Sequence, residues 1–416
     1  MNRIVLLENF CKKIGIFNIN VKQSSATPHS QTTSTIIKNQ KIAYGPYGQL
    51  LLEQIKNEWI RANLNKFKSN FLIKNSNILK QIESNEQEIK LSSFFDNMFA
   101  RFNIDKLPIG LINVFNSLTD DTPKEFEYMV KVNEELNFLT KHQSVPYTNL
   151  NCLHFCGNGS NEKQLKESFV DPLTFWQRER KNWWVKFLRS PENVTIITGK
   201  EQNIEQTNIC YQEDLSLSNE KDNQTPFFYW LENVRHLDPS QNDQLKRFLK
   251  PFRHNQLLSE AKQVILTQTN CENVLENVLF DSVEFPFMKK HKNLKNKHSG
   301  KTVFNLDYRL APYKAALLFE SKENNNDMSL IANDLKKQFY SHRINVMLMT
   351  PSNENDLDDK YTLLDEMGIP YAVYLPFSII KDGLCFIRNR DTSLSEKTHI
   401  SLVVKHFNSI TNALQF

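Results

Sequence analysis

The sequence predicts an α/β protein, α+β in overall arrangement, whose carboxyl end forms a compact α/β domain. Beyond residue 301, strand-like and helical segments alternate over about 110 residues, a pattern that favours one mixed sheet. Upstream, helical and strand-like segments are separated by long polar stretches, so a larger unit precedes this domain. Glycine is scarce, with 10 in 416 residues, which argues against glycine-rich loops that cradle phosphates.

Hydrophobic spacing and turn residues predict the individual elements. In the larger unit we expect a helix over 4–14, a turn at 44–48 leading into a helix, a buried strand over 107–115, an amphipathic helix over 175–187, a strand over 264–267 and a helix over 274–280. The helix after the turn has an apolar stripe of Leu51, Leu52, Ile55 and Trp59. The polar stretch 198–225 is predicted to be irregular. In the carboxyl-terminal domain we expect strands at 315–319, 345–349, 371–375 and 384–387, and helices at 329–340, 355–367 and 399–414.

Composition limits the chemistry. Lys and Arg number 51 against 47 Asp and Glu, and the net charge of +4 allows a nucleic-acid partner without requiring one. No apolar run approaches the roughly 18 residues of a membrane helix, so we expect a soluble protein without a membrane partner. Six cysteines make no disulfide framework in a chain of this length, and Cys152, His154 and Cys156 lack a fourth metal ligand. We therefore expect structural thiols and no metal.

The first 41 residues carry six Lys or Arg and one acid, Glu8, with Ser and Thr enriched from residue 24 to 34. This composition is typical of a mitochondrial targeting segment. An ordinary surface helix followed by a polar linker is the alternative, and Leu7, Phe10 and Cys11 at helical spacing allow both roles. The expected domains are thus 1–41, 42–301 and 302–416.

Three motifs in the last 110 or so residues carry a family resemblance: Leu-Asp-Tyr-Arg-Leu-Ala-Pro-Tyr-Lys at 306–314, Leu-Asp-Glu-Met-Gly-Ile-Pro-Tyr at 364–371 and Arg-Asn-Arg-Asp-Thr at 388–392. In that order they resemble the anticodon-binding domain that ends several class II aminoacyl-tRNA synthetases. Together with the Gly-Pro-Tyr-Gly turn at 45–48, the Leu-Pro-Ile-Gly strand at 107–110 and the tryptophan-rich helix, they resemble the accessory subunits of mitochondrial DNA polymerases.

The resemblance implies a class II synthetase-like antiparallel sheet body over 42–301 and an anticodon-binding-like domain with a mixed sheet over 302–416. It also implies a non-catalytic protein of the mitochondrial matrix and nucleoid, without a cofactor. Its partners would be the catalytic polymerase subunit and double-stranded primer-template DNA, and its role would be to raise processivity.

The residue chemistry agrees that the chain is not an enzyme. A class II synthetase holds the ATP phosphates with an arginine on its motif-2 strand and a second arginine in motif 3. The matching stretch 107–118 has no arginine, and none lies between Arg253 and Arg309, where the only glycine is Gly300. A pocket without these guanidinium groups lacks the main electrostatic stabilisation of the reacting phosphate.

Two basic segments are candidate DNA contacts. A stretch without acids over 289–301 offers phosphate contacts from Lys289, Lys290, Lys292, Lys295, Lys297 and Lys301, unless it is simply a solvated linker. The helix over 175–187 offers Arg178, Lys181 and Lys186. Its basic residues, Arg180 included, are expected on the face opposite the aromatic residues. Its Trp176, Trp183 and Phe187 are predicted to pack in the core rather than to stack on bases.

The candidate partner-binding residues lie in the carboxyl-terminal domain. They are Phe377, Ile379, Ile380, Arg388 and Arg390. An ordinary hydrophobic loop anchor explains the three apolar residues equally well.

The expected assembly is a monomer in a one-to-one heterodimer. Vertebrate members of the family dimerise through a helical hairpin inserted after the Gly-Pro-x-Gly helix, and the corresponding space from Trp59 to Leu107 is under 50 residues here, without two strong amphipathic helices. Two other functions stay open: a mitochondrial class II aminoacyl-tRNA synthetase, and a non-catalytic tRNA-binding paralogue. Both DNA and tRNA are read largely through phosphates, so the sequence does not separate them.

Overall fold

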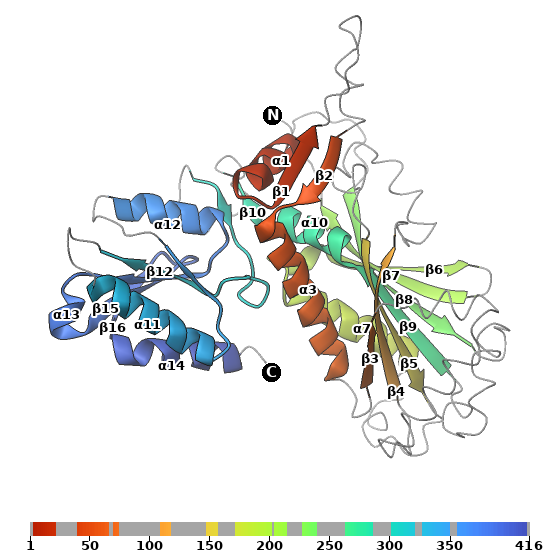
Figure 1. Cartoon of the computed structure of the whole chain (residues 1–416). Coiled ribbons are helices and arrows are strands. Elements are labelled where there is room, and N and C mark those ends of the chain that lie inside the picture. The colour runs from red at the N-terminus through yellow and green to blue at the C-terminus, as the bar shows by residue number, and fades with distance from the viewer. Residues whose placement is uncertain are drawn as a thin grey trace, which may run out of the picture.

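A computed structural model of the chain gives the fold (Figure 1). The structure describes residues 3–21, 40–65, 70–74, 109–117, 147–156, 171–201, 204–213, 227–238, 263–285, 301–320, 327–349 and 356–413. The lysine-rich stretch 289–300 and the connecting stretches 75–108 and 118–146 lie outside these residues.

The body is built on a seven-stranded sheet with strand order β3-β4-β5-β9-β8-β7-β6. Its strands are β3 (Asn70–Lys74), β4 (Ile109–Ser117), β5 (Tyr147–Cys156), β6 (Val194–Glu201), β7 (Ile204–Glu213), β8 (Phe227–Leu237) and β9 (Gln263–Asn270). Strand β3 pairs with β4 in parallel, and all the other neighbours are antiparallel. This confirms the expected class II synthetase-like antiparallel body.

Three helices lie on one face of this sheet: α3 (Pro46–Leu64), α7 (Pro172–Val185) and α10 (Cys271–Ser282) (Figure 1). Helix α3 begins with Pro at its first turn and buries the predicted apolar stripe that includes Leu51, Ile55 and Trp59. Helix α10 starts where the Asn270 side chain accepts hydrogen bonds from the backbone N–H groups of Glu272 and Asn273, at 3.0 and 3.1 Å. A shared apolar core therefore lies between the helices and the sheet.

The amino-terminal residues are part of this body. Helix α1 (Arg3–Lys13) buries Leu7, Phe10 and Cys11 in the body core. Strand β1 (Phe17–Val21) pairs antiparallel with β2 (Gln40–Tyr44). Because β2 continues past residue 41, the expected boundary at 41/42 falls inside a strand.

The prediction of irregular structure over 198–225 was wrong for its described part. Residues there belong to an antiparallel hairpin, in which Val194 of β6 pairs with Tyr211 of β7 and Glu201 pairs with Ile204. The alternation of polar and apolar side chains is weak in this stretch, and main-chain pairing to β8 holds the hairpin in the sheet. Polar composition alone therefore misled the prediction.

Helix α7 is held by a buried ion pair rather than by apolar contacts alone. The Arg180 Nε donates to both carboxylate oxygens of Glu232 on β8, at 2.9 and 3.0 Å. The indole N–H groups of Trp184 and Trp59 donate to the same carboxylate, at 2.7 and 3.2 Å. Burial raises the pKa of Glu232, whereas the Arg180 charge and these hydrogen bonds favour the ionised carboxylate. One carboxylate thus joins α3, α7 and β8.

This cluster corrects two sequence expectations. Arg180 is buried, although it was grouped with basic residues on an exposed face. The fully buried tryptophans of α7 are Trp176 and Trp184. Trp183, expected in the core stripe, is half-buried and stands 4.6 Å from the Arg180 guanidinium. Packing of the aromatic residues is confirmed for Trp176 and Phe187, which are both buried.

The carboxyl-terminal domain has a five-stranded mixed sheet of order β13-β12-β14-β15-β16. Its strands are β12 (Ala315–Phe319), β13 (Val346–Leu348), β14 (Tyr371–Leu375), β15 (Leu384–Asn389) and β16 (Ser395–His399). Strand β12 pairs in parallel with β13 and β14, and the β14–β15 and β15–β16 pairs are antiparallel. The four predicted strands are confirmed, and β16 was not predicted because its sequence, Ser-Glu-Lys-Thr-His, is polar throughout.

Helices cover both faces of this sheet. Helices α11 (Asp327–Ser341) and α14 (Ile400–Ala413) share one core, in which Phe339 and Phe407 meet edge to face. Helix α12 (Leu357–Glu366) packs on the other face through Leu364. A short helix, α13 (Ile379–Asp382), precedes β15 and ends at Gly383, whose positive φ of 67° suits a residue without Cβ.

The boundary between the two cores lies further along the chain than residue 301. Strand β11 (Val303–Phe304) pairs with β10 (Val283–Glu284) of the body. Phe304, Leu306 and Leu310 pack in the body core, whereas the second core starts at Ala315. Residues 303–311 therefore belong to the body by packing, although they open the anticodon-binding-like motif in sequence.

We predict that Glu232→Gln lowers the free energy of unfolding by about 3 kcal/mol, because it leaves the buried Arg180 charge without a counter-charge. The double variant Arg180→Met/Glu232→Gln should recover part of this loss, since both charges are then gone. Urea denaturation measures both values. Glu284→Gln, which breaks the half-exposed Arg189–Glu284 pair, is the control and should change stability by less than about 1 kcal/mol. A double variant less stable than Glu232→Gln would contradict this role for the charge.

Candidate functional site

A row of side-chain amides crosses the sheet face that lies away from α3, α7 and α10. Cross-strand pairing aligns Asn113 of β4, Asn151 of β5, Gln268 of β9, Asn233 of β8 and Asn208 of β7. All five side chains are buried. Residues directly opposite each other on neighbouring strands point to the same face, so the five amides form one line.

The neighbouring positions establish which face this is. Ile112, Cys152 and Val234 alternate with the amides along their strands and pack in the core beneath the helices. The amide line therefore covers the face of the sheet that these helices leave uncovered (Figure 1). Within the line, Asn233 Nδ2 donates to Asn208 Oδ1 at 2.8 Å.

The charge on this face is low. Arg235 lies two residues beyond Asn233 on the same face and donates from a terminal nitrogen to Gln268 Oε1 at 2.6 Å. Strand β4 carries no arginine, and neither does the β9–α10 unit. Neutral amides supply hydrogen bonds but no counter-charge, so this face offers weak stabilisation to a polyphosphate compared with a pair of guanidinium groups.

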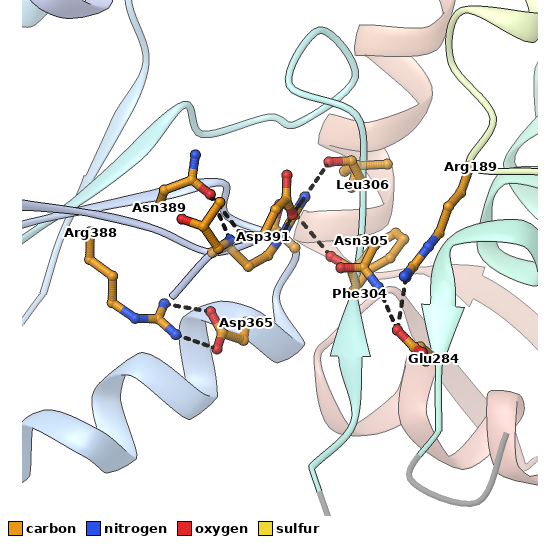
Figure 2. Close-up of polar contacts among 12 residues, drawn as sticks. Arg189, Glu284, Phe304, Asn305, Leu306, Asp365, Arg388, Asn389 and Asp391 are labelled. Carbon is orange, nitrogen blue, oxygen red and sulfur yellow. Dashed lines mark hydrogen bonds and ion pairs between the residues drawn. The ribbon is translucent and has the colours of Figure 1, made fainter. Parts of the chain in front are cut away.

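The three carboxyl-terminal motifs meet at the joint between the two cores (Figure 2). The Arg390 guanidinium donates to the backbone carbonyls of Phe304, Gly368 and Leu306, at 3.0, 2.9 and 3.0 Å. Its Nε donates to Asp391 at 2.9 Å. A planar guanidinium with five donors can satisfy several fixed carbonyls at once. Arg390 thus ties the segment that leaves the body to the core of the second domain.

Arg388 forms a second internal contact beside this joint. Its two terminal nitrogens donate to the two carboxylate oxygens of Asp365, at 2.8 and 2.9 Å (Figure 2). The guanidinium also lies 4.7 Å from the Tyr361 ring. Both Arg388 and Arg390 are buried, and their donors make contacts within the chain. Their buried positions do not favour the hypothesis that Arg388 and Arg390 contact a partner protein.

Contacts from the body reinforce the joint. The Tyr47 hydroxyl donates to the Met367 carbonyl, and the Tyr47 ring stacks near Tyr313 with centroids 6.4 Å apart. Lys13 of α1 pairs with Glu366 of α12 at 2.7 Å. Arg309 donates to the Lys186 carbonyl and lies 4.4 Å from the Phe187 ring. The tryptophan-rich helix and the first carboxyl-terminal motif are therefore in direct contact.

Lys314 closes the loop that follows the joint. Its ammonium group donates to the carbonyls of Tyr308, Arg309 and Ala311, at 2.7, 3.0 and 2.9 Å. Burial lowers the pKa of Lys314 to about 8, and the charges of Glu58 and Asp307 partly oppose this shift. Glu58 is itself buried, which raises its pKa. The protonation state of Lys314 therefore affects the hydrogen bonds that hold the backbone next to the joint.

The candidate DNA-binding residues are only partly described. Arg178 and Lys186 are exposed and Lys181 is half-buried, so all three lie at the surface of α7. Lys289, Lys290, Lys292, Lys295 and Lys297 fall outside the described residues. Lys301 is exposed and donates to Thr362 at 2.5 Å. The structure does not bring a described lysine cluster together with α7.

The apolar partner candidates separate into two kinds. Ile379 is buried in the second core, and Phe377 is half-buried with its N–H donating to Glu320 at 2.8 Å. Ile380 is 45% exposed and can contact another molecule. Of these three residues, Ile380 alone has a surface position suited to a partner.

No metal site is found among the described residues. The six cysteines are free and buried, which confirms the prediction of structural thiols. His154 stacks on Trp176 with ring centroids 3.7 Å apart, and burial lowers its pKa, so the neutral ring packs beside the thiol of Cys152. Across the described part of the chain, no helix is both long and apolar enough to cross a bilayer.

Comparison with known proteins relates the chain to two groups. It is 33% identical over 114 residues to the glycine–tRNA ligase of Thermobifida fusca, covering 27% of this chain and 23% of that protein. It is 27% identical over 165 residues to the glycine–tRNA ligase of Mycoplasma mycoides, covering 38% and 34%. It is 22% identical over 236 residues to the mitochondrial DNA polymerase subunit gamma-2 of Xenopus laevis, covering 55% and 47%.

The chain is related to glycyl-tRNA synthetases and to the gamma-2 subunit of mitochondrial DNA polymerase. It matches less than half of the length of each of these relatives. No family model matches the chain. The relation agrees with the class II-like sheet and with the mixed sheet of the carboxyl-terminal domain.

Sequence reasoning missed several residues of the joint and of the amide row. The row had no sequence signal, because four asparagines and one glutamine on five strands become neighbours only through strand pairing. Glu232 also gave no signal, since a lone acid in a strand does not indicate burial. The motif around Arg390 was found, but its role as an internal clamp could not be read from its spacing.

We predict that Arg390→Ala lowers the free energy of unfolding by about 3 kcal/mol, because three buried carbonyls lose their donors. Arg390→Lys should recover little, since one ammonium group does not reproduce the planar fork. Urea denaturation gives the stability, and limited proteolysis should show faster cleavage near residues 303–311. Arg178→Ala, at an exposed helical position, is the control and should leave both measurements unchanged. Wild-type stability of Arg390→Ala would exclude the clamp.

We predict a pH-dependent contribution from Lys314. Its pKa is about 8 in the folded protein against an ordinary 10.5, so between these values the unfolded chain binds more protons. Stability contributed by this group therefore rises with pH across this window and is lost as the pH falls. The free energy of unfolding of the wild type minus that of Lys314→Met should increase by on the order of 1–3 kcal/mol from pH 8 to pH 10.5.

The control for this measurement is Lys337→Met, which removes an exposed lysine from α11. Its difference from the wild type should stay flat over the same pH range. A difference for Lys314→Met that is flat, or that falls with pH, would show that the pKa of Lys314 is not lowered.

Proposed function

We propose that the chain is a non-catalytic accessory subunit of a mitochondrial DNA polymerase. In this role it binds the catalytic subunit through the carboxyl-terminal domain and holds primer-template DNA, so that the complex dissociates from DNA more slowly. The complex contains one copy of this chain and one catalytic subunit. Added phosphate contacts lengthen the residence time and weaken as salt rises.

The amide row is the observation that carries this proposal. On the sheet face opposite α3, α7 and α10, five buried amides line up across β4, β5, β9, β8 and β7. Catalysis of adenylation needs preorganised positive charge at the phosphates, and neither β4 nor the β9–α10 unit contains a lysine or an arginine. The relation to the gamma-2 subunit supports the polymerase as partner.

The exposed side of α3 supports a complex with a single copy of this chain. In class II synthetases the helix after the Gly-Pro-x-Gly turn lies at the dimer interface. Here its exposed residues are mostly polar, including Gln49, Glu53, Asn57 and Arg61, with Leu50 as the apolar exception at 40% exposure. Such a surface resembles solvated helix faces more than an obligate interface.

A glycine–tRNA ligase is the second candidate, because several ligases of this kind match the chain and Arg235 lies on the amide face. Glycine-dependent exchange of pyrophosphate into ATP separates the two functions. The accessory-subunit proposal expects no exchange above a no-enzyme control, and robust exchange would favour the ligase.

The main test measures product length from the mitochondrial polymerase at increasing ionic strength, with and without this protein. We expect longer products in its presence and a loss of this effect as salt rises. Replacing Lys289, Lys290 and Lys292 together by Ala should make the salt dependence of duplex binding less steep, by about one unit of slope for each phosphate that these lysines neutralise.

The matched control replaces three lysines that are exposed elsewhere in the structure, namely Lys12, Lys337 and Lys405. It removes the same charge from other surfaces and should leave the slope unchanged. Product length that does not respond to this protein at any salt concentration would rule out the processivity role. An unchanged slope for the 289–292 variant would exclude those lysines as phosphate contacts.

A further inference from the structure

The outer edge of β16 has no pairing strand among the described residues. Strand β16 is the last strand of the carboxyl-terminal sheet and pairs with β15 on one side. No described strand pairs with its other side. Four of its five side chains are exposed and the fifth, Thr398, is half-buried. An edge of this kind presents backbone N–H and C=O groups that another extended chain can pair with.

Exposed apolar side chains lie at both ends of this edge. Leu394, directly before the strand, is 67% exposed, and Leu402, in the first turn of α14, is 50% exposed. The backbone at Leu394 is fixed, because its carbonyl accepts from Asn389 N–H at 2.9 Å and its N–H donates to Thr392 Oγ1 at 3.3 Å. The leucine is therefore held outward by an ordered turn.

Ile380 is also exposed near the carboxyl-terminal end of β16. Gly383, three residues further on, lies directly against the His399 ring, since a Cβ at Gly383 would collide with His399 Nε2. The Gly383 carbonyl accepts from Ile400 N–H at 2.9 Å. A strand added along β16 would thus have Leu394 near one end and Leu402 and Ile380 near the other.

We propose that β16 accepts an extended segment of the partner protein as an added sixth strand of this sheet. The inference rests on the proposed function, because the segment is assigned to the catalytic subunit. Backbone hydrogen bonds to β16 would supply part of the affinity, and Leu394, Leu402 and Ile380 would anchor the ends. Alternating side chains of the added strand would meet the two faces of the sheet.

A second copy of this chain is a poorer occupant. Full antiparallel overlap of two β16 strands sets Lys397 directly opposite Lys397, and like charges in such positions are destabilising. Lys397 lies opposite Phe386 of β15 and faces the α12 side, whereas Glu396 lies opposite Ile387 and faces the side of α11 and α14. A complementary strand would place an acid beside Lys397 and a base beside Glu396.

The test measures binding of the full-length chain to the catalytic subunit, using two variants and a matched control. Leu394→Asp and Leu402→Asp should each weaken binding at least tenfold. Leu330→Asp is the control, because Leu330 is 66% exposed on α11, which packs on β12 and β13 at the other end of the sheet. It should change the affinity by less than twofold. All three side chains are exposed, so circular dichroism should show an unchanged fold.

Hydrogen–deuterium exchange of the wild-type complex tests strand addition directly. Amides of residues 395–399 that do not bond to β15 should exchange at least tenfold more slowly in the complex. Amides of β13, at the opposite edge, should be unchanged. Side-chain contact without strand pairing would leave the β16 amides unprotected and would overturn the inference.

The outcomes separate this inference from the proposed function. If the wild type binds the catalytic subunit, but the β16 amides are unprotected and both leucine variants bind normally, strand addition is wrong and the accessory function stands. If the wild type does not bind the catalytic subunit at all, the proposed function fails and the inference fails with it.

Discussion

The carboxylate of Glu232 is the contact on which the body depends most. It lies on β8 with no exposure, and it receives hydrogen bonds from Arg180, Trp184 and Trp59. Two of these donors belong to α7 and one to α3. A buried charge is tolerable only when it is paired and fully hydrogen-bonded, so the helices must sit where their donors reach this carboxylate. The position of α7 then fixes Phe187 and the Lys186 carbonyl, against which Arg309 packs.

At the joint between the domains, cations likewise hold the carboxyl-terminal domain against the body. Arg390 binds the backbone carbonyls of Phe304, Leu306 and Gly368. Lys314 binds three other carbonyls, between residues 308 and 311. Cations that satisfy main-chain carbonyls fix the path of the backbone itself, independent of side-chain packing. The two domains are therefore connected by a stiff segment.

The body and the carboxyl-terminal domain differ in the side chains that they present at their surfaces. One sheet face of the body is lined by neutral amides, which do not favour nucleotide chemistry, while Arg388 and Arg390 are buried in internal contacts. The accessible features of the second domain include a strand edge that no other described strand pairs with, flanked by exposed leucines. A relation to both glycyl-tRNA synthetases and the gamma-2 subunit agrees with a shared scaffold whose sites have diverged.

Much of the fold followed from the sequence. The strands at Ala315–Phe319 and Tyr371–Leu375 were predicted with correct bounds, because short apolar runs between turn residues leave few alternatives. The stripe of α3 was predicted because apolar residues at helical spacing must face a core. The hairpin β6–β7 and strand β16 were missed, since their polar residues form strands only through pairing with neighbours already in the sheet.

The contacts of the candidate site depended on tertiary structure far more than the helices and strands did. The sequence by itself determined that arginines are missing from the stretches matching the synthetase motifs, since an absent residue type is visible without a fold. Only the tertiary structure decided that five amides form one line, that Arg180 is buried on Glu232 and that Arg388 and Arg390 point inward. Composition and spacing constrain contacts within one helix or strand, whereas these contacts join residues that are tens to hundreds of positions apart. Strand register and burial determine these contacts, and neither can be predicted from the local sequence.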